Sequence, residues 1–183
     1  MNETQLVKGC LSGDRNAQRA LYDMYSRKML GICMRYVNNR EVARDLLQDG
    51  FVKVFTSLPS FEGTGTLEAW MRTIFVNESL GYLRRTDILN RSGDIDMANA
   101  IQDESESAVS KMSADELMAM VGRLPAGFRT VFNMYTVEGY SHKEIANTLH
   151  ITESTSRSQY VRARKLLQEQ IRNAGYHPGY LYD

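Results

Sequence analysis

Residues 151–172 form a basic stretch whose side chains are suited to contacting DNA. The stretch carries five Lys or Arg residues against two acidic residues. Arginine can pair with guanine edges, glutamine with adenine, and hydroxyl groups with phosphate oxygens. The side chains that could make these contacts are Ser154, Thr155, Arg157, Ser158, Gln159, Arg162 and Lys165. Their types and spacing favour DNA binding over an ordinary solvated helix face.

A second group of polar side chains, Asp45, Gln48 and Asp49, recurs at positions i, i+3 and i+4. This spacing places all three on one face of a helix. Two carboxylates and an amide could bind a basic partner, but spacing alone favours the simpler interpretation of a solvated acidic edge.

Two short helices must position the basic stretch. Ser141 and Glu144 have the spacing of a capping box and predict a helix start, which an apolar stripe at 145, 146 and 149 continues. Thr152 can cap a second helix that begins at Glu153 and packs through Ala163, Leu166 and Leu167. A capped helix, a tight turn and a basic helix together predict a helix-turn-helix motif.

Three positions of this motif need comment. His150 stands where many such turns carry glycine, because one residue there needs a positive φ. Ser156 stands where an apolar residue usually holds the second helix on the first, and we expect its side chain to point away from the packed face. We interpret His142 as a surface residue at a helix start.

The first half of the chain predicts four more helices, over 4–11, from Asp14 to 37, over 40–58 and over 67–85. The residues expected on the inner face of the second helix are Ala17, Leu21, Met24 or Tyr25, Leu30, Cys33 or Met34, and Val37. Thr66 is a candidate cap for the fourth helix, after a loop over 61–66 that contains threonine and glycine. Such a loop beside Trp70 and a basic helix end could hold single-stranded bases.

Composition predicts an all-α protein, and a break in the apolar pattern divides it into two small helical domains. The 183 residues include 22 basic and 22 acidic residues, and this balance argues against a wholly basic nucleic-acid coat. The acidic residues concentrate in the segment 86–112, which lacks apolar periodicity and reads as a flexible linker. We expect domains at 1–85 and 113–173, with a short tail at 174–183. Opposite charge lets this linker shield the basic faces when the protein is free.

Two cysteines, Cys10 and Cys33, are too few for a disulfide framework, and we expect buried thiols in a reducing cytoplasm. No apolar run is long enough to cross a membrane, and the N-terminus does not resemble a signal peptide. No cluster has the spacing of a metal or acid–base site, so no cofactor, metal or catalytic residue is expected.

Motifs in both halves occur in an order that resembles one known family. The first half contains DLLQDGF at 45–51, AWMRTI at 69–74 and LRR at 83–85, and the second contains LP at 124–125, EGYS at 138–141, KEIA at 143–146 and TSRSQ at 155–159. Together they resemble sigma factors of bacterial RNA polymerase, of the extracytoplasmic-function group that keeps only regions 2 and 4.

The resemblance changes the interpretation of the acidic face. In this family the corresponding stretch binds core RNA polymerase, through its β′ subunit, which implies that role for Asp45, Gln48, Asp49 and Phe51. Region 2 of the family also melts the −10 promoter element and captures an extruded base. The residues implied for −10 binding are Phe61, Gly63, Thr64, Trp70, Asn77, Arg84 and Arg85.

The helix-turn-helix would then read the −35 element, and the implied partners are core polymerase (β′ and β subunits), promoter DNA and an anti-sigma factor. Gly81 stands where the family often has an acidic residue, so −10 recognition could differ here. Two other hypotheses remain open from the residues alone: a ligand-responsive helix-turn-helix regulator that acts as a dimer, and an all-α enzyme. The enzyme fits least well.

Overall fold

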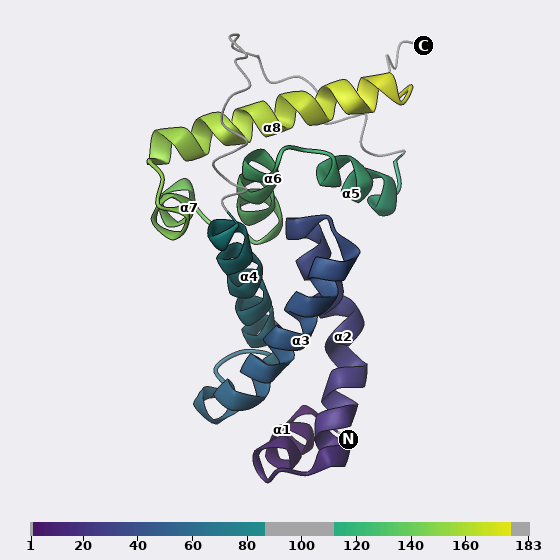
Figure 1. The fold of residues 1–183 in the computed structure, drawn as a ribbon, viewed down its shortest axis with the longest axis vertical. Helices are drawn as coiled ribbons and strands as arrows, with labels where there is room; N and C mark the ends of the chain where they lie inside the picture. The colour runs from purple at the N-terminus through teal and green to yellow at the C-terminus, as the bar shows by residue number, and fades with distance from the viewer. Residues whose placement is uncertain (1, 87–111, 177–183) are drawn as a thin grey trace, which may run out of the picture. The chain divides into compact units, whose positions relative to one another are not determined.

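Every regular element in the described part of the chain is a helix, so the all-α prediction is confirmed. The computed structural model describes residues 2–86 and 112–176 (Figure 1). It divides at Thr86 into two compact units, which we call the N-terminal unit (residues 2–86) and the C-terminal unit (residues 112–176). Residues 87–111, which make up most of the acidic segment 86–112 with its predicted shielding role, and residues 177–183 lie outside the described residues.

The N-terminal unit is a helical bundle in which α2 packs against the other helices. Helices α1 and α3 and the longer α4 all contact α2, and α3 also contacts α4. The helices are α1 (Glu3–Leu11), α2 (Arg15–Val37), α3 (Arg40–Ser57), the 3-10 turn η1 (Leu58–Ser60) and α4 (Leu67–Arg85). The predicted caps Asp14 and Thr66 are confirmed, because each side chain accepts a hydrogen bond from a backbone N–H of the first turn.

The inner face of α2 was predicted only in part. Ala17, Leu21 and Cys33 are buried as expected. Met24, which was one of two alternatives at its position, is 52% exposed, and Tyr25 is buried in its place. The core also takes Met29, Ile32 and Tyr36, which the prediction left out. Because α2 packs against helices on more than one side, the residues that it buries are spread wider than one stripe.

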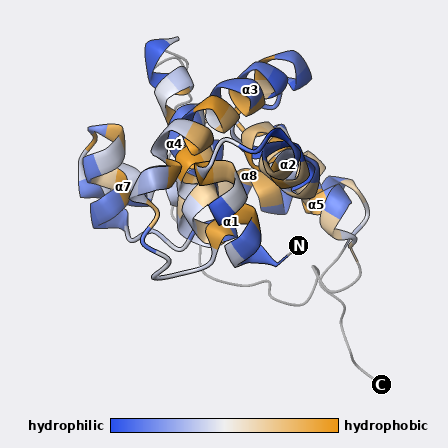
Figure 2. Cartoon of the chain, turned by 90° about the horizontal axis from the view of Figure 1, so that it is seen from below, coloured by the Kyte–Doolittle hydropathy of each residue, from blue (hydrophilic) through white to orange (hydrophobic). Residues whose placement is uncertain are grey.

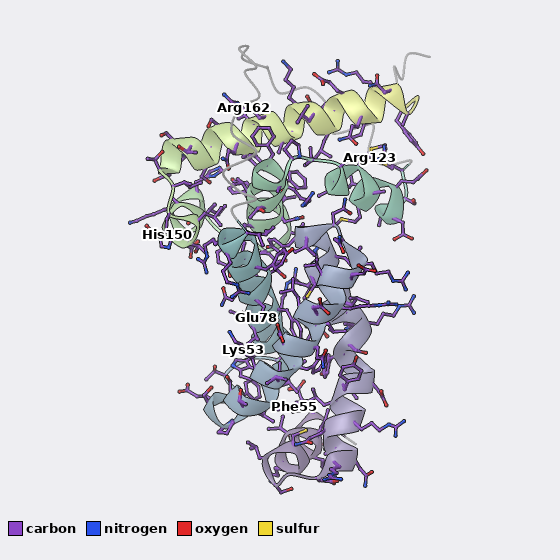
Figure 3. The ribbon with its side chains drawn as sticks, viewed as in Figure 1. Lys53, Phe55, Glu78, Arg123, His150 and Arg162 are labelled. Atoms are coloured by element: carbon purple, nitrogen blue, oxygen red, sulfur yellow. The ribbon has the colours of Figure 1, made fainter. Side chains whose placement is uncertain are left out.

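Two ion pairs join helices of the N-terminal unit. Lys28 on α2 lies 2.6 Å from Glu68 on α4, and Lys53 on α3 pairs with Glu78 on α4 (Figure 3). Both thiols are free and buried, and burial raises the pKa of Cys33 to about 11. A thiol with this pKa stays protonated at neutral pH, so it is a poor nucleophile.

The C-terminal unit is built around one long helix. Its elements are α5 (Ala114–Gly122), α6 (Ala126–Phe132), the π-helical segment η4 (Asn133–Val137), α7 (His142–Leu149) and α8 (Glu153–Asn173). The second half of α8 packs on α5 and α6 through a buried apolar cluster of Met120, Val121, Leu124, Phe128, Ala163, Leu167 and Ile171. Hydrophobic and hydrophilic residues accordingly occupy different sides of the helices (Figure 2).

Candidate functional site

The predicted helix-turn-helix is formed by α7, the turn at 150–152 and α8. Ser141 and Glu144 make the capping box: the Glu144 N–H donates to Oγ of Ser141 over 3.2 Å, and the Ser141 N–H donates to Oε2 of Glu144 over 2.8 Å. His150 has a φ of 57°, the left-handed conformation that this turn requires, and it lies where α7 gives way to α8 (Figure 3). Thr152 then caps α8, accepting from the Thr155 N–H.

The first half of α8 carries an exposed polar stripe. Ser154, Arg157 and Ser158 are exposed and lie on one side, because about 3.6 residues make one helical turn. Thr155 and Arg162 are half-buried and flank this stripe on one side, and the half-buried Lys165 lies in line with it further along α8. The predicted reader Gln159 is also half-buried, about 140° around the helix from Ser154. The structure thus places Gln159 nearer to the packed side of α8 than to the stripe.

One further residue, Val161, is exposed on this stripe and was not among the predicted DNA contacts. An apolar side chain offers no hydrogen bond, so its type gave no signal in the sequence. Arg157, in contrast, is already oriented: its guanidinium donates to Oε1 of Glu153 over 2.5 Å. Glu153 belongs to the first turn of α8, where a carboxylate is stabilised by the helix dipole.

The acidic face of α3 is present in the N-terminal unit. Asp45, Gln48 and Asp49 are all exposed, whereas Phe51 is only 4% exposed. Gln48 and Phe51 help to line a hollow of about 720 Å³ between α2 and α3. The Phe51 ring lies 5.3 Å from that of Phe75, so it connects this hollow to the core. The structure therefore places Phe51 beneath the acidic face rather than on it.

The residues implied for −10 binding follow α4 and the loop before it. The ring centroids of Phe61 and Trp70 are 5.4 Å apart, and both side chains are half-buried. Gly63 has a φ of 70°, a conformation that glycine adopts without strain, and Thr64 beside it is exposed. The remaining residues of this group, Asn77, Arg84 and Arg85, are exposed further along α4. The aromatic pair and the polar loop thus adjoin each other, whereas the basic end of α4 lies about 21 Å further along the helix from Trp70.

Each of the two units matches a known protein family. The sigma-70 region 2 family matches residues 21–88, and the sigma-70 region 4 family matches residues 114–167. The chain belongs to the sigma-70 family. As a sigma factor it directs promoter-specific initiation of transcription, and the first of the three functional hypotheses is confirmed.

Curated relatives of this sigma factor match nearly its whole length. It is 29% identical to the RNA polymerase sigma-H factor of Pseudomonas aeruginosa, over 94% of this chain and 97% of that protein. It is 28% identical to the ECF RNA polymerase sigma-E factor of Haemophilus influenzae, over 93% and 96%. A solved structure, the sigma factor RpoE of Bartonella quintana in complex with the anti-sigma factor NepR, shares the fold with a TM-score of 0.51 and 21% identity, over 84% of this chain and 96% of that one.

Two of the sequence predictions for this sigma factor's helix-turn-helix were wrong. His142 is buried rather than a surface residue, and Ser156 is fully buried rather than pointing away from the packed face. The two side chains meet: Nδ1 of His142 lies 2.9 Å from Oγ of Ser156. A hydrogen bond between α7 and α8 therefore replaces the apolar contact usual at this place. Neither a histidine nor a serine by itself predicts a buried position. Each polar group can be buried here because it is hydrogen-bonded to the other.

Aromatic rings enclose this hydrogen bond. Tyr135 stacks on the imidazole of His142 at 4.4 Å, and the Tyr160 ring lies 5.7 Å from it, edge to face. Burial lowers the pKa of His142 below its usual value, Arg157 lowers it further, and Glu153 raises it. The neutral imidazole is thus the form that the site stabilises, and the charged form is disfavoured by burial and by the positive charge of Arg157.

The hydrogen bond predicts strong non-additivity. Ser156→Ala leaves a buried imidazole nitrogen without its partner and should destabilise the α7–α8 pair by about 1–2 kcal/mol. His142→Phe with Ser156→Ala replaces both polar groups with apolar ones, so the double variant should be more stable than Ser156→Ala alone. Hydrogen exchange in peptides from α7 and α8 measures the local stability of the single and the double variant. A double variant less stable than the single one would contradict this account.

The dependence of stability on pH tests the burial of His142 independently. Because the folded-state pKa of His142 lies below that of the unfolded chain, the unfolded state binds the proton more readily. The wild-type C-terminal unit should therefore lose stability as the pH falls below about 6.5, and variants that carry His142→Phe should lack this component.

Proposed function

We propose that the two units divide the work of a promoter-specificity subunit. The N-terminal unit binds core RNA polymerase through the acidic face of α3 and holds the −10 element along α4, and the C-terminal unit reads the −35 element through α8. The observation that carries the proposal is the exposed stripe of Ser154, Arg157 and Ser158 on α8, within the match to sigma-70 region 4. Helices of such motifs enter the major groove with their N-terminal residues toward the bases.

The protein acts without a catalytic site of its own and works in the cytoplasm, beside the polymerase. In the described residues, no group of three or more His, Cys, Asp or Glu side chains could hold a metal ion. No helix among those residues is long and apolar enough to cross a membrane. Because a related fold has been solved as a sigma factor bound to an anti-sigma factor, we expect an anti-sigma factor to regulate this chain as well.

Polymerase binding is supported by the separation of charge from core on α3. Asp45 and Asp49 are exposed, whereas Leu46 and Val54 on the same helix are buried. Charged groups held on a rigid, well-packed helix suit a basic partner surface, because neither partner must order a loop on binding. The ion pair of Lys53 with Glu78 further fixes α3 against α4.

The −10 assignment rests on the aromatic pair of Phe61 and Trp70. Their half-exposed rings can stack on an unpaired base whatever its identity, since every base has a π-face. Thr64 in the adjoining loop can hydrogen-bond the base edge, and the exposed Arg84 and Arg85 suit the phosphate backbone.

Reversing the charge of Asp49 tests the polymerase face. Asp49→Lys should weaken binding to core polymerase by about 1–3 kcal/mol, because it places a positive charge against a basic surface. Asp23→Lys is the matched control, since Asp23 is also an exposed aspartate of the N-terminal unit but lies on α2. Titration of fluorescently labelled chain with core enzyme gives both affinities. Equal affinity of the Asp49→Lys and Asp23→Lys variants would rule out this face as the contact.

A further inference from the structure

Val161 is an exposed apolar residue in the middle of the polar stripe on α8. It is 50% exposed and does not belong to the buried cluster that holds α8 on α5 and α6. Ser154 and Val161 are seven residues apart, about two helical turns, so their side chains project within about 20° of each other. Arg157 and Ser158 lie on either side of that direction. Any surface that the polar stripe faces is therefore faced by the isopropyl group of Val161 as well.

Packing does not account for this residue. A single exposed hydrophobic side chain is ordinary on a protein surface. Valine, however, has a lower helix propensity than the long polar residues that could occupy an exposed helical site, and at Val161 little burial compensates for it. On the opposite side of α8, Ser156 and Ala163 are fully buried. The position of Val161 on the DNA-facing side thus calls for an apolar partner outside the chain.

The major groove offers one apolar group on its base edges, the C5 methyl group of thymine. Val161 is three residues beyond Ser158, a rise of about 4.5 Å along the helix. Successive base pairs are about 3.4 Å apart, so Val161 faces a base pair next to the one that Ser158 or Arg157 approaches. A β-branched side chain with a fixed rotamer presents two methyl groups to that base without further ordering.

We propose that Val161 is a specificity-determining residue that recognises the methyl group of one thymine in the −35 element. This inference rests on the proposed function of α8. It adds an apolar contact to the hydrogen-bonding readout by Arg157 and Ser158, and it assigns an A·T pair to one position of an otherwise unknown element.

The test removes single methyl groups from the DNA. A promoter is first selected from a library randomised in the −35 region, with the full chain bound to core polymerase. Each thymine of the selected element, on either strand, is then replaced by deoxyuridine, which keeps base pairing and lacks only the methyl group. Wild-type holoenzyme should lose affinity about three- to fivefold at one thymine, the factor expected from one buried methyl group.

Val161→Ala should lose affinity for the unmodified promoter by a similar factor and should no longer distinguish thymine from uracil at that position. Val137→Ala is the matched control, because Val137 is also an exposed valine of the C-terminal unit but lies on η4, and it should keep the uracil penalty. A penalty that persists in Val161→Ala, no uracil penalty at any thymine, or a selected element without an A·T pair would each overturn the proposal.

Failure of the proposed function would look different. If no promoter can be selected, or if Arg157→Ala leaves the base preference unchanged, the reading of the −35 element by α8 is itself wrong. If Arg157→Ala changes the preference while Val161→Ala keeps every uracil penalty, α8 reads the element and only the role of Val161 is rejected.

Discussion

Replacing Gly50 with alanine should destabilise the N-terminal unit by about 3 kcal/mol, near the upper end of the usual cost of overpacking. A β-carbon at this position would lie 2.2 Å from Cε1 and 2.6 Å from Cδ1 of Phe75. The Phe75 ring is fully buried and cannot move aside without displacing its neighbours. The gain of about 1 kcal/mol in helix propensity offsets only part of this cost.

Gly31→Ala is the matched control for Gly50→Ala. Gly31 is also a helical glycine of the N-terminal unit, but a β-carbon there would meet nothing within 4 Å. This variant should be as stable as the wild type or more stable by up to about 1 kcal/mol. Urea unfolding followed by fluorescence of Trp70, the one tryptophan in the sequence, reports on the N-terminal unit.

A compensating substitution sharpens the test. Phe75→Leu in the Gly50→Ala background should recover part of the lost stability, because the smaller side chain makes room for the new methyl group. Additive effects of the two substitutions would show that the contact between Gly50 and Phe75 does not limit the packing of α3 on α4. Gly50 lies within the DLLQDGF motif, so this residue of the motif serves the fold and not the partner.

The second large effect is expected from Arg129→Met in the C-terminal unit. Arg129 is 7% exposed, and its Nη1 donates to the carbonyl oxygens of Gly122 and Leu124, each over 3.0 Å. These carbonyls belong to the end of α5 and the connection to α6. Methionine keeps much of the apolar volume but donates nothing, so two carbonyls lose charge-assisted hydrogen bonds, at a cost of about 3 kcal/mol.

Arg123→Met is the control, since Arg123 is exposed beside the same connection (Figure 3). It should change stability by less than about 0.5 kcal/mol. Hydrogen exchange in peptides that cover α5 and α6 measures the local stability directly. Equal protection in the two variants would mean that the hydrogen bonds from Arg129 do not hold α5 to α6.

The features of the fold that depend on neighbouring residues were predicted well from the sequence. The caps Asp14, Thr66, Ser141 and Thr152 all accept the expected backbone hydrogen bonds. Such caps are set by side chains two or three residues from the groups that they satisfy, so a linear pattern contains the whole interaction. The positive φ of His150 also follows from its place between two capped helices.

The features that were missed depend on residues distant in the sequence. Met29 and Tyr36 are buried because other helices cover their side of α2. His142 and Ser156 are fourteen positions apart, and only the packing of α7 against α8 makes each the other's partner. Gly50 gives no sign in the sequence that Phe75 will lie against it. Val161 became a candidate only when its exposure was known.

Within its 21 residues, helix α8 carries the exposed polar stripe in its first half and packs on the apolar cluster through its second half. The stripe begins at Ser154, about 13 Å from Ala163 along the axis, so a tilt of about 5° at the cluster would shift that end by about 1 Å. A shift of this size is enough to spoil a base contact that must be held within about 0.5 Å. Packing at the apolar cluster therefore sets the orientation of the whole helix. The hydrogen bond between His142 and Ser156 restrains its N-terminal end. Substitutions at Met120 or Val121, which are buried in the apolar cluster, can consequently change promoter choice before they unfold the protein.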